Sequence, residues 1–394
     1  MILDKLFQLM AEKQASDLFV SAGTPIHIKI QGNTLPVNQQ TMLPDMIQKM
    51  AYELMTPEQI KTFEASHEMN LSFGVRDVGN FRVNIFRQRG SISMVVRFIL
   101  GNIPTLESLG LPPVLADLIM EKRGLILIVG ATGSGKSTTI ASMLDYRNTN
   151  RSGHILTVED PIEFLFKHKK SIVNQREIGM DTLDWQAALK NAMRQAPDCI
   201  LIGEIRDKET MQAAIAYAQT GHLCLATLHA NNSYHAMNRI ISFFPLENRP
   251  ALFLDLSVAL RAVISQRLVK KPDGVRAAAC EIMLNTRHIS ELIERGEVQA
   301  IKEAMEQTLA PGSQTFEQDL LALYRRGTIT LDEAMANADS PTNLAWLVNN
   351  SESTAGNGKN DTKDAAPLDF AKANEGPSFD DFKLHLADHD EEKS

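Results

Sequence analysis

The feature that most constrains this chain is a glycine-rich octapeptide between an apolar run and a helical stretch. Residues 130–137 read Gly-Ala-Thr-Gly-Ser-Gly-Lys-Ser, after the strand-like Leu125–Val129 and before the helical Thr138–Leu144. In such a loop, glycines let backbone N–H groups surround phosphate oxygens at the positive end of a helix. A glycine turn without a ligand is the weaker alternative in this context, so the sequence predicts an α/β fold that binds a nucleotide.

The loop residues have separate predicted roles. Lys136 is expected to reach the outer phosphates and Ser137 to ligate a metal ion, so ATP and Mg²⁺ are the predicted cofactors. The predicted nucleotide-binding residues are Gly130, Ala131, Thr132, Gly133, Ser134, Gly135, Lys136, Ser137 and Thr138.

A carboxylate follows a second buried strand. Cys199–Ile202 is apolar and ends in Gly203-Glu204-Ile205-Arg206-Asp207. The carboxyl ends of parallel strands meet at one edge of a sheet, which brings Glu204 beside the phosphate site. We predict that Glu204 holds the metal ion or positions water, the alternative being a plain surface carboxylate.

Three carboxylates lie between these two motifs. The segment 154–163 reads His-Ile-Leu-Thr-Val-Glu-Asp-Pro-Ile-Glu, so a strand delivers Glu159, Asp160 and Glu163 into a turn that Pro161 fixes. Hydrolysis needs a group that orients and deprotonates water, a role suited to a carboxylate near the γ-phosphate. Glu163 is the predicted base and Glu159 the competing candidate. Alternatively, one or more of the three only caps a helix.

A histidine ends another buried strand. Residues 220–231 read Thr-Gly-His-Leu-Cys-Leu-Ala-Thr-Leu-His-Ala-Asn, which places His229 in a polar turn after the strand Leu223–Thr227. His229 is a candidate sensor of the γ-phosphate. A single histidine is more often structural, so this prediction depends on the neighbouring motifs.

The 394 residues, 44% of them hydrophobic, suffice for two domains. Residues 1–100 alternate strand and helix patterns and predict a small α+β domain. Residues 101–113 are rich in Gly and Pro and predict a linker. Residues 114–349 form the predicted α/β ATPase domain, with a helical end from Arg287. The polar composition of residues 350–394 predicts a disordered tail.

Charge and composition limit the class of protein. The segment 351–394 holds eleven Asp and Glu against five Lys, so it carries most of the formal net charge of −8. The rest is nearly neutral, which argues against a nucleic-acid binder. Three widely separated cysteines, Cys199, Cys224 and Cys280, predict reduced thiols rather than a zinc cluster. Without a spanning apolar run or a basic leader, a cytoplasmic location is expected.

Together the motifs resemble the secretion-ATPase superfamily. GATGSGKS corresponds to Walker A, TVEDPIE to the acidic box, LIGEIRD to the atypical Walker B and TGHLCLATLHAN to the histidine box, in the order of the family and within a match over about residues 1–345. The resemblance implies a RecA-like P-loop core, a PAS-like N-terminal domain and a ring-shaped homo-hexamer. It also implies that Arg82 and Arg97 reach a nucleotide in a neighbouring subunit, the alternative being that both are solvated strand residues.

The short N-terminal region and the missing cysteine cluster resemble the PilT/PilU retraction ATPases within that superfamily. Where the PilT branch carries two arginines, this chain reads His288-Ile-Ser-Glu-Leu-Ile-Glu294, and an acidic tail with Phe379 and Phe382 follows. Both features are more typical of the PilU branch. The implied function is type IV pilus retraction and twitching motility, at the cytoplasmic face of the inner membrane at the pilus base.

The implied partners are a PilT-like paralogue and an inner-membrane pilus platform protein, with no nucleic acid. Two other functions stay open. One is an accessory nucleotide-binding subunit that docks on the PilT ring with little hydrolysis of its own. The other is a DNA-translocating ATPase, which the neutral body and acidic tail disfavour. The apolar residues of the tail are expected to dock a partner, unless the tail only aids solubility.

Overall fold

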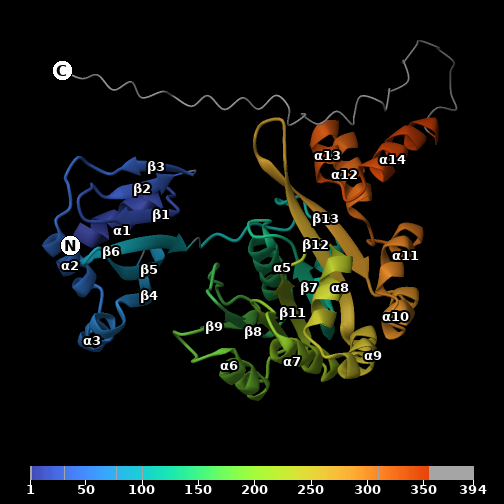
Figure 1. The fold of residues 1–394 in the computed structure, drawn as a ribbon, viewed down its shortest axis with the longest axis horizontal. Coiled ribbons are helices and arrows are strands. Elements are labelled where there is room, and N and C mark those ends of the chain that lie inside the picture. The colour runs from blue at the N-terminus through green and yellow to red at the C-terminus, as the bar shows by residue number, and fades with distance from the viewer. Residues whose placement is uncertain (1, 31, 77, 100, 309, 355–394) are drawn as a thin grey trace, which may run out of the picture. The chain divides into compact units, whose positions relative to one another are not determined.

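The structure, a computed structural model, describes residues 2–354 except 31, 77, 100 and 309. Met1–Val348 form one compact unit that holds two β-sheets with separate hydrophobic cores (Figure 1). Residues 350–354 of the predicted disordered tail are helical, so the tail begins later than predicted. The rest of the tail, with its apolar docking residues, lies outside the described residues. No helix among the described residues is long and apolar enough to span a bilayer.

The N-terminal sheet is antiparallel throughout, with the strand order β3-β2-β1-β6-β5-β4. Its strands are β1 (Asp17–Val20), β2 (His27–Ile30), β3 (Asn33–Pro36), β4 (Glu68–Val75), β5 (Gly79–Gln88) and β6 (Ser91–Ile99). Its helices are α1 (Ile2–Glu12), α2 (Pro44–Glu53) and α3 (Pro57–Ser66).

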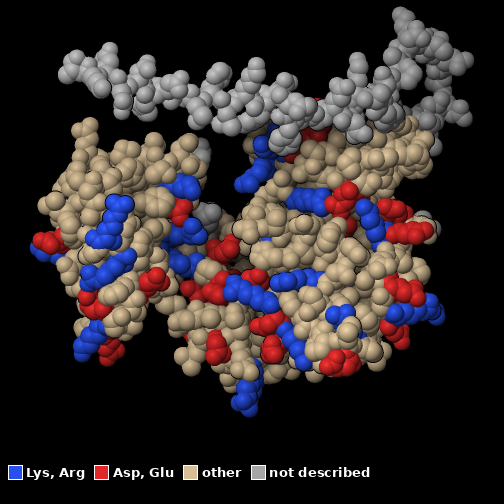
Figure 2. Space-filling view, viewed as in Figure 1, with Lys and Arg blue, Asp and Glu red and all other residues tan. Residues whose placement is uncertain are grey.

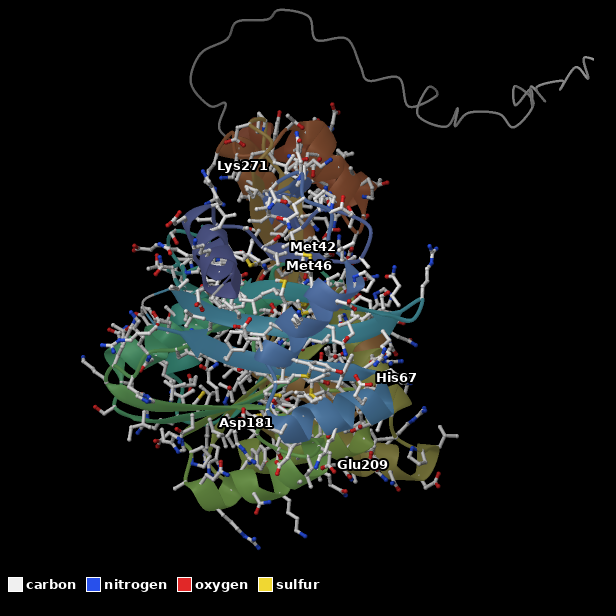
Figure 3. The ribbon with its side chains drawn as sticks, turned by 90° about the vertical axis from the view of Figure 1, so that its left-hand side faces the viewer. Met42, Met46, His67, Asp181, Glu209 and Lys271 are labelled. Carbon is white, nitrogen blue, oxygen red and sulfur yellow. The ribbon has the colours of Figure 1, made fainter. Side chains whose placement is uncertain are left out.

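One face of this sheet forms a core with the three helices. Strand β5 alternates, so that Phe81, Val83 and Ile85 are buried, and the ring of Phe81 stacks on Phe7 of α1 at 4.6 Å between centroids. Figure 3 shows Met42 and Met46 at the start of α2, where both join this core. This sheet and its three helices therefore form a small α+β part of the chain within residues 1–100, called here the N-terminal unit, with a hydrophobic core of its own.

The second sheet has the order β13-β12-β7-β11-β10-β8-β9, parallel except for the pair β12–β13. Its strands are β7 (Gly124–Val129), β8 (Gly153–Glu159), β9 (Ser171–Glu177), β10 (Cys199–Ile202), β11 (Leu223–Leu228), β12 (Leu260–Lys270) and β13 (Arg276–Leu284). The helices that follow the first sheet are α4 (Val114–Met120), α5 (Lys136–Asn150), α6 (Trp185–Ala192), α7 (Lys208–Gln219), α8 (Ser233–Ser242), α9 (Arg249–Ala259), α10 (Arg287–Glu294), α11 (Ile301–Gln307), α12 (Phe316–Arg325), α13 (Leu331–Asn337) and α14 (Pro341–Thr354).

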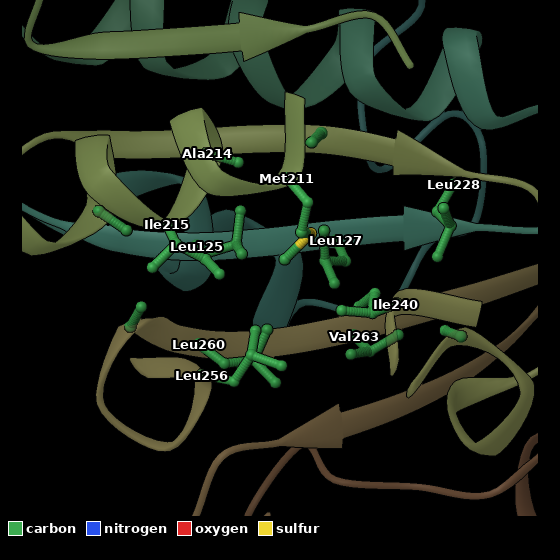
Figure 4. Packing of buried hydrophobic residues seen from close by; sticks show 14 of the residues in the cluster. Leu125, Leu127, Met211, Ala214, Ile215, Leu228, Ile240, Leu256, Leu260 and Val263 are labelled. Atoms are coloured by element: carbon green, nitrogen blue, oxygen red, sulfur yellow. The ribbon is translucent and has the colours of Figure 1, made fainter. Parts of the chain in front are cut away.

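Helices cover both faces of this sheet, which is why its central strands are continuous apolar runs. Leu125 and Leu127 of β7 pack with residues of α7 and α9, as Figure 4 shows. Ile126 and Ile128 point to the other face and pack with α4 and α5. The sheet is largely parallel and buried on both faces, and its strand β7 leads into the glycine-rich loop. This arrangement confirms the predicted α/β, RecA-like P-loop fold.

Most of the predicted elements are present, but strands β3 and β4 of the N-terminal sheet and two groups of strands in the second sheet were not predicted. Strands β7, β8, β10 and β11 lie where the apolar runs indicated them, and the three cysteines are buried free thiols, as expected. Strand β9 and the antiparallel pair β12–β13 extend the sheet at its two sides. On the face in Figure 2, cationic and acidic side chains of the described residues are intermingled.

Candidate functional site

The phosphate-binding loop connects β7 to α5, as predicted. Gly135 precedes α5 with φ +87°, and a side chain at Gly130 would meet the hydroxyl of Ser134 and the carbonyl of Gln266 at about 2.5 Å. Both positions therefore require glycine. Lys136 donates from Nζ to the carbonyl oxygens of Gly130 and Ala131, at 2.7 and 2.9 Å. The ammonium group of Lys136 therefore lies against the backbone of the loop that precedes it.

A cavity of about 240 Å³ opens beside this loop. It gathers residues from the ends of β8, β10 and β11 as well as from the loop itself, as expected for the carboxyl edge of a parallel sheet. Its walls include eight of the predicted site residues: Thr132, Gly133, Lys136, Ser137, Glu159, Glu163, Glu204 and His229. The remaining loop residues, Gly130, Ala131, Ser134, Gly135 and Thr138, shape the loop without lining this cavity.

Glu204 is held by two neighbours. Its Oε1 lies 3.3 Å from Nε2 of His229, and its Oε2 accepts a 2.6 Å hydrogen bond from Nε of Arg206. The guanidinium of Arg206 also lies 3.5 Å from a carboxylate oxygen of Asp160. Arg206 therefore links the strand end that carries Glu204 to the acidic segment. The sequence pattern indicated no role for Arg206, although it stands two residues after Glu204.

Glu159 and Glu163 have different surroundings. Glu159 ends β8, where it accepts hydrogen bonds from Oγ1 of Thr157 at 2.6 Å and Nε2 of Gln175 at 3.3 Å. Removal from water in the cavity wall raises the pKa of Glu159 to about 7, because those hydrogen bonds only partly offset the burial. Glu163 lies in the following loop and is exposed to the cavity. Burial also lowers the pKa of Lys136, and the nearby carboxylates of Glu204 and Glu163 oppose that shift.

The two arginines that were predicted to reach a nucleotide, Arg82 and Arg97, lie apart from this cavity. Arg82 and Arg97 are paired across β5 and β6. Nε of Arg97 forms an ion pair with Asp17 at 2.9 Å. Nη2 of Arg82 reaches the second sheet, where it contacts Glu177 and the carbonyl of Ile162, each at 2.8 Å. Neither side chain lines the cavity, so their role toward a nucleotide stays a prediction.

A second cavity of about 660 Å³ also borders the loop, at Gly135. The start of α5 contributes Thr138 and Thr139, and β12 contributes Gln266 and Leu268. Further wall residues come from segments 107–111 and 275–278, and from Lys271, Leu323, Arg326 and Thr328. The sequence did not predict this cavity, because its walls come from distant segments that share no motif.

The oxygen donors of the first cavity suit a hard cation. Ser137, Glu204 and Glu163 all line it, and Mg²⁺ prefers one or two carboxylates, a hydroxyl and phosphate oxygens. Within the described residues no three His, Cys, Asp or Glu side chains converge as a cation site. Such a convergence is not required of a magnesium ion that nucleotide phosphates help to hold.

Known proteins resemble this chain along most of its length. The family model described as Type II/IV secretion system protein matches residues 1–275. The chain is 47% identical over 349 residues to the type IV pilus ATPase PilU of Pseudomonas aeruginosa, covering 88% of this chain and 91% of that protein. It is 40% identical over 344 residues to the type IV pilus retraction ATPase PilT of the same organism, covering 87% and 100%. The crystal structure of the pilus retraction motor PilT with bound ADP aligns with a TM-score of 0.81 and 42% identity, over 87% of this chain and 98% of that one.

Proposed function

This chain belongs to the Type II/IV secretion system protein family and is a P-loop ATPase, and from that premise we propose that it is a motor for type IV pilus retraction. The observation that carries the proposal is a single cavity lined by Lys136, Ser137, Glu163, Glu204 and His229. These side chains cover the tasks of ATP hydrolysis: phosphate binding, metal binding and water activation.

Each residue has a proposed task. The backbone N–H groups of residues 130–137 bind phosphate oxygens, and Lys136 neutralises charge on the outer phosphates. Ser137 and Glu204 would hold Mg²⁺, which would supply further neutralisation of the phosphate oxygens. Glu163 is the proposed base. Its exposure to the cavity supports this choice, because the carboxylate of Glu159 already accepts hydrogen bonds from Thr157 and Gln175.

The second cavity is the proposed position of the base and ribose of ATP. It adjoins the loop at Gly135 and Thr138, and Glu159, Glu163 and Glu204 do not line it. Leu268 supplies an apolar wall for a purine ring, and Lys271 and Arg276 supply positive charge at the rim. A nucleotide lying across the loop would thus have its phosphates in the first cavity.

The assembly belongs to the same proposal. We expect a homo-hexamer at the cytoplasmic face of the inner membrane, acting on a platform protein at the pilus base together with a PilT-like paralogue. Residues 1–100 would form a PAS-like domain, residues 101–113 a hinge and residues 114–349 the ATPase domain. Arg82 and Arg97 would stabilise charge on a neighbouring subunit's nucleotide, at a stage of the cycle when they leave their partners in this structure.

A second function is supported by α10. This helix carries Glu291 and Glu294 within the stretch where the PilT branch has arginines. An accessory subunit, which binds nucleotide and modulates a PilT ring with little hydrolysis of its own, would tolerate that difference.

The two functions are separated by steady-state Mg²⁺-ATP hydrolysis. The purified chain is measured alone and mixed with the PilT-like paralogue, and Lys136→Ala serves as the blank. We expect turnover of the chain alone and a fall of at least about 10²-fold in Lys136→Ala, because preorganised charge on the phosphates is lost. Turnover at the level of the blank in both conditions would instead support the accessory subunit.

A further inference from the structure

Both polar backbone groups of Ile162 are bound by one pair of charged side chains. The N–H of Ile162 donates to Oε2 of Glu177 at 3.1 Å, and its carbonyl accepts from Nη2 of Arg82 at 2.8 Å. The same Nη2 donates to Oε2 of Glu177 at 2.8 Å. The two side chains thus close a ring of hydrogen bonds around a single peptide residue.

This arrangement of Arg82 and Glu177 around Ile162, called the clamp below, is buried. The side chains of Arg82 and Glu177 are 16% and 10% exposed, and Ile162 is buried. Charge-assisted hydrogen bonds are stronger away from water, and a buried charge that loses its partner is strongly unfavourable. The clamp should therefore fix the position of Ile162 more firmly than an exposed ion pair would.

Glu177 is itself held in place on the second sheet. It ends β9 in register with Glu159, which ends β8, and its N–H donates to Oδ2 of Asp181 at 2.8 Å. The next residue, Ile178, donates its N–H to the carbonyl of Glu159 at 2.9 Å. Glu177 is therefore a fixed point beside the acidic segment.

Glu163, the proposed base, directly follows Ile162 in the chain. A base is effective only when its carboxylate lies within hydrogen-bond reach of the attacking water, and a shift of about 1 Å can cost on the order of 10²-fold in rate. We propose that Glu177 and Arg82 form a clamp that positions Glu163, so that the N-terminal sheet controls hydrolysis through the backbone of Ile162. This inference rests on the proposed ATPase function and assigns Glu177 as a positioning residue.

Arg82 is the part of the clamp that comes from the other sheet. Its Nε is buried and has no hydrogen-bond partner among the described residues. The Nε–H group of Arg82 is therefore free to donate a further hydrogen bond. Such a free donor fits a side chain that exchanges partners during the cycle of ATP hydrolysis. When the N-terminal sheet moves away, Ile162 loses one partner and Glu177 retains a buried charge, so the loop should loosen.

The strand β5 also supplies a matched control. Arg87 lies five residues after Arg82 and forms an ion pair with Glu64 of α3 at 2.6 Å, within the N-terminal unit. Arg87→Ala and Arg82→Ala delete the same side chain from the same strand. Only Arg82→Ala removes a contact with the acidic segment.

The first test is amide hydrogen exchange of the full chain without nucleotide, followed in peptides that cover residues 160–166. We expect about tenfold faster exchange there in Arg82→Ala and Glu177→Ala, and no change in Arg87→Ala. Arg82→Lys, which keeps the charge, should give an intermediate rate and guards against a variant that fails to fold. An arginine that acts only on the nucleotide would leave this exchange unchanged, and that result would overturn the clamp.

The second test is kinetic. In both Arg82→Ala and Glu177→Ala we expect kcat to fall about 10- to 100-fold with KM for ATP within about threefold, because the phosphate loop is untouched. The double variant should lose little more than either single one, since both remove the same clamp. Additive losses would count against it. If the wild-type chain hydrolyses no ATP, the proposed function fails, whereas the exchange experiment still decides on the clamp.

Discussion

The two sheets of this chain distribute their polar side chains in opposite ways. In the antiparallel N-terminal sheet, ion pairs such as Arg97–Asp17 and Arg87–Glu64 join neighbouring elements of the same unit. In the parallel sheet, charged residues from three strand ends meet at one cavity. Parallel strands all end at the same edge, so distant segments converge there, whereas antiparallel strands alternate their ends. Strand direction, more than composition, therefore decides where a cluster of charged side chains forms.

The largest expected effect comes from removing the proposed base at that edge. Glu163→Gln keeps the shape of the side chain but cannot accept a proton, so kcat should fall by about 10²- to 10⁴-fold. ATP binding should remain, because Lys136 and the phosphate loop are unchanged. Single-turnover hydrolysis and binding of a fluorescent ATP analogue separate these two quantities.

Two variants serve as references for Glu163→Gln. Glu209→Gln makes the same chemical change on the exposed first turn of α7 and should leave kcat unchanged. Glu159→Gln should lower kcat far less than Glu163→Gln does. If Glu159→Gln lowers kcat more than Glu163→Gln does, Glu159 is the base, and the assignment of Glu163 from its exposure to the cavity is wrong.

The next effect is on stability and concerns Glu159. Its pKa is about 7 in the folded chain and about 4.5 in a free side chain, so the folded state alone holds this proton between those pH values. The free energy of unfolding should therefore fall as pH rises from about 4.5 to 7, and the contribution should be constant above that. Glu159→Gln removes the penalty and should stabilise the protein at pH 8 by up to about 3 kcal/mol.

Urea unfolding at pH 4.5 and at pH 8 measures this difference. The variant and the wild-type chain should be equally stable at the lower pH and differ only at the higher one. An equal difference at both pH values would mean that the substitution acts through packing, with no contribution from the proton.

The site was predictable where sequence order reflects spatial order. Lys136, Glu163, Glu204 and His229 each follow an apolar run, and parallel pairing of those runs brings them together. Glu177 was not predictable, because β9 reads Ser-Ile-Val-Asn-Gln-Arg-Glu and its polar composition conceals a strand. Its partner Arg82 comes from the other sheet, and no local pattern specifies that contact.

The prediction of the fold was also limited by what local sequence patterns specify. The pair β12–β13 was missed although Lys271-Pro272-Asp273-Gly274 carries a turn signal, with Gly274 at φ +82° and Lys271 donating its N–H to the carbonyl of Val275 at 2.7 Å. The second cavity depends on this pair. Turn chemistry therefore held information about the site that a search for apolar runs did not use.

The smallest expected effect concerns two ion pairs of equal length, one beside each of the two sheets. Arg206 and Arg87 each contact a glutamate at 2.6 Å. The partner of Arg206 is Glu204, which lines the cavity, whereas Arg87 and its partner Glu64 both belong to the N-terminal unit. The side chain of Arg206 is 53% exposed, so solvent screens the pair and its contribution to stability is small. Its effect should instead appear in the orientation of Glu204.

Arg206→Gln should lower kcat about three- to tenfold and raise the Mg²⁺ concentration needed for half-maximal rate, while Arg87→Gln changes neither. Magnesium titrations of both variants at fixed ATP test this, and equal behaviour would mean that the position of an arginine relative to the sheet edge has no bearing on catalysis.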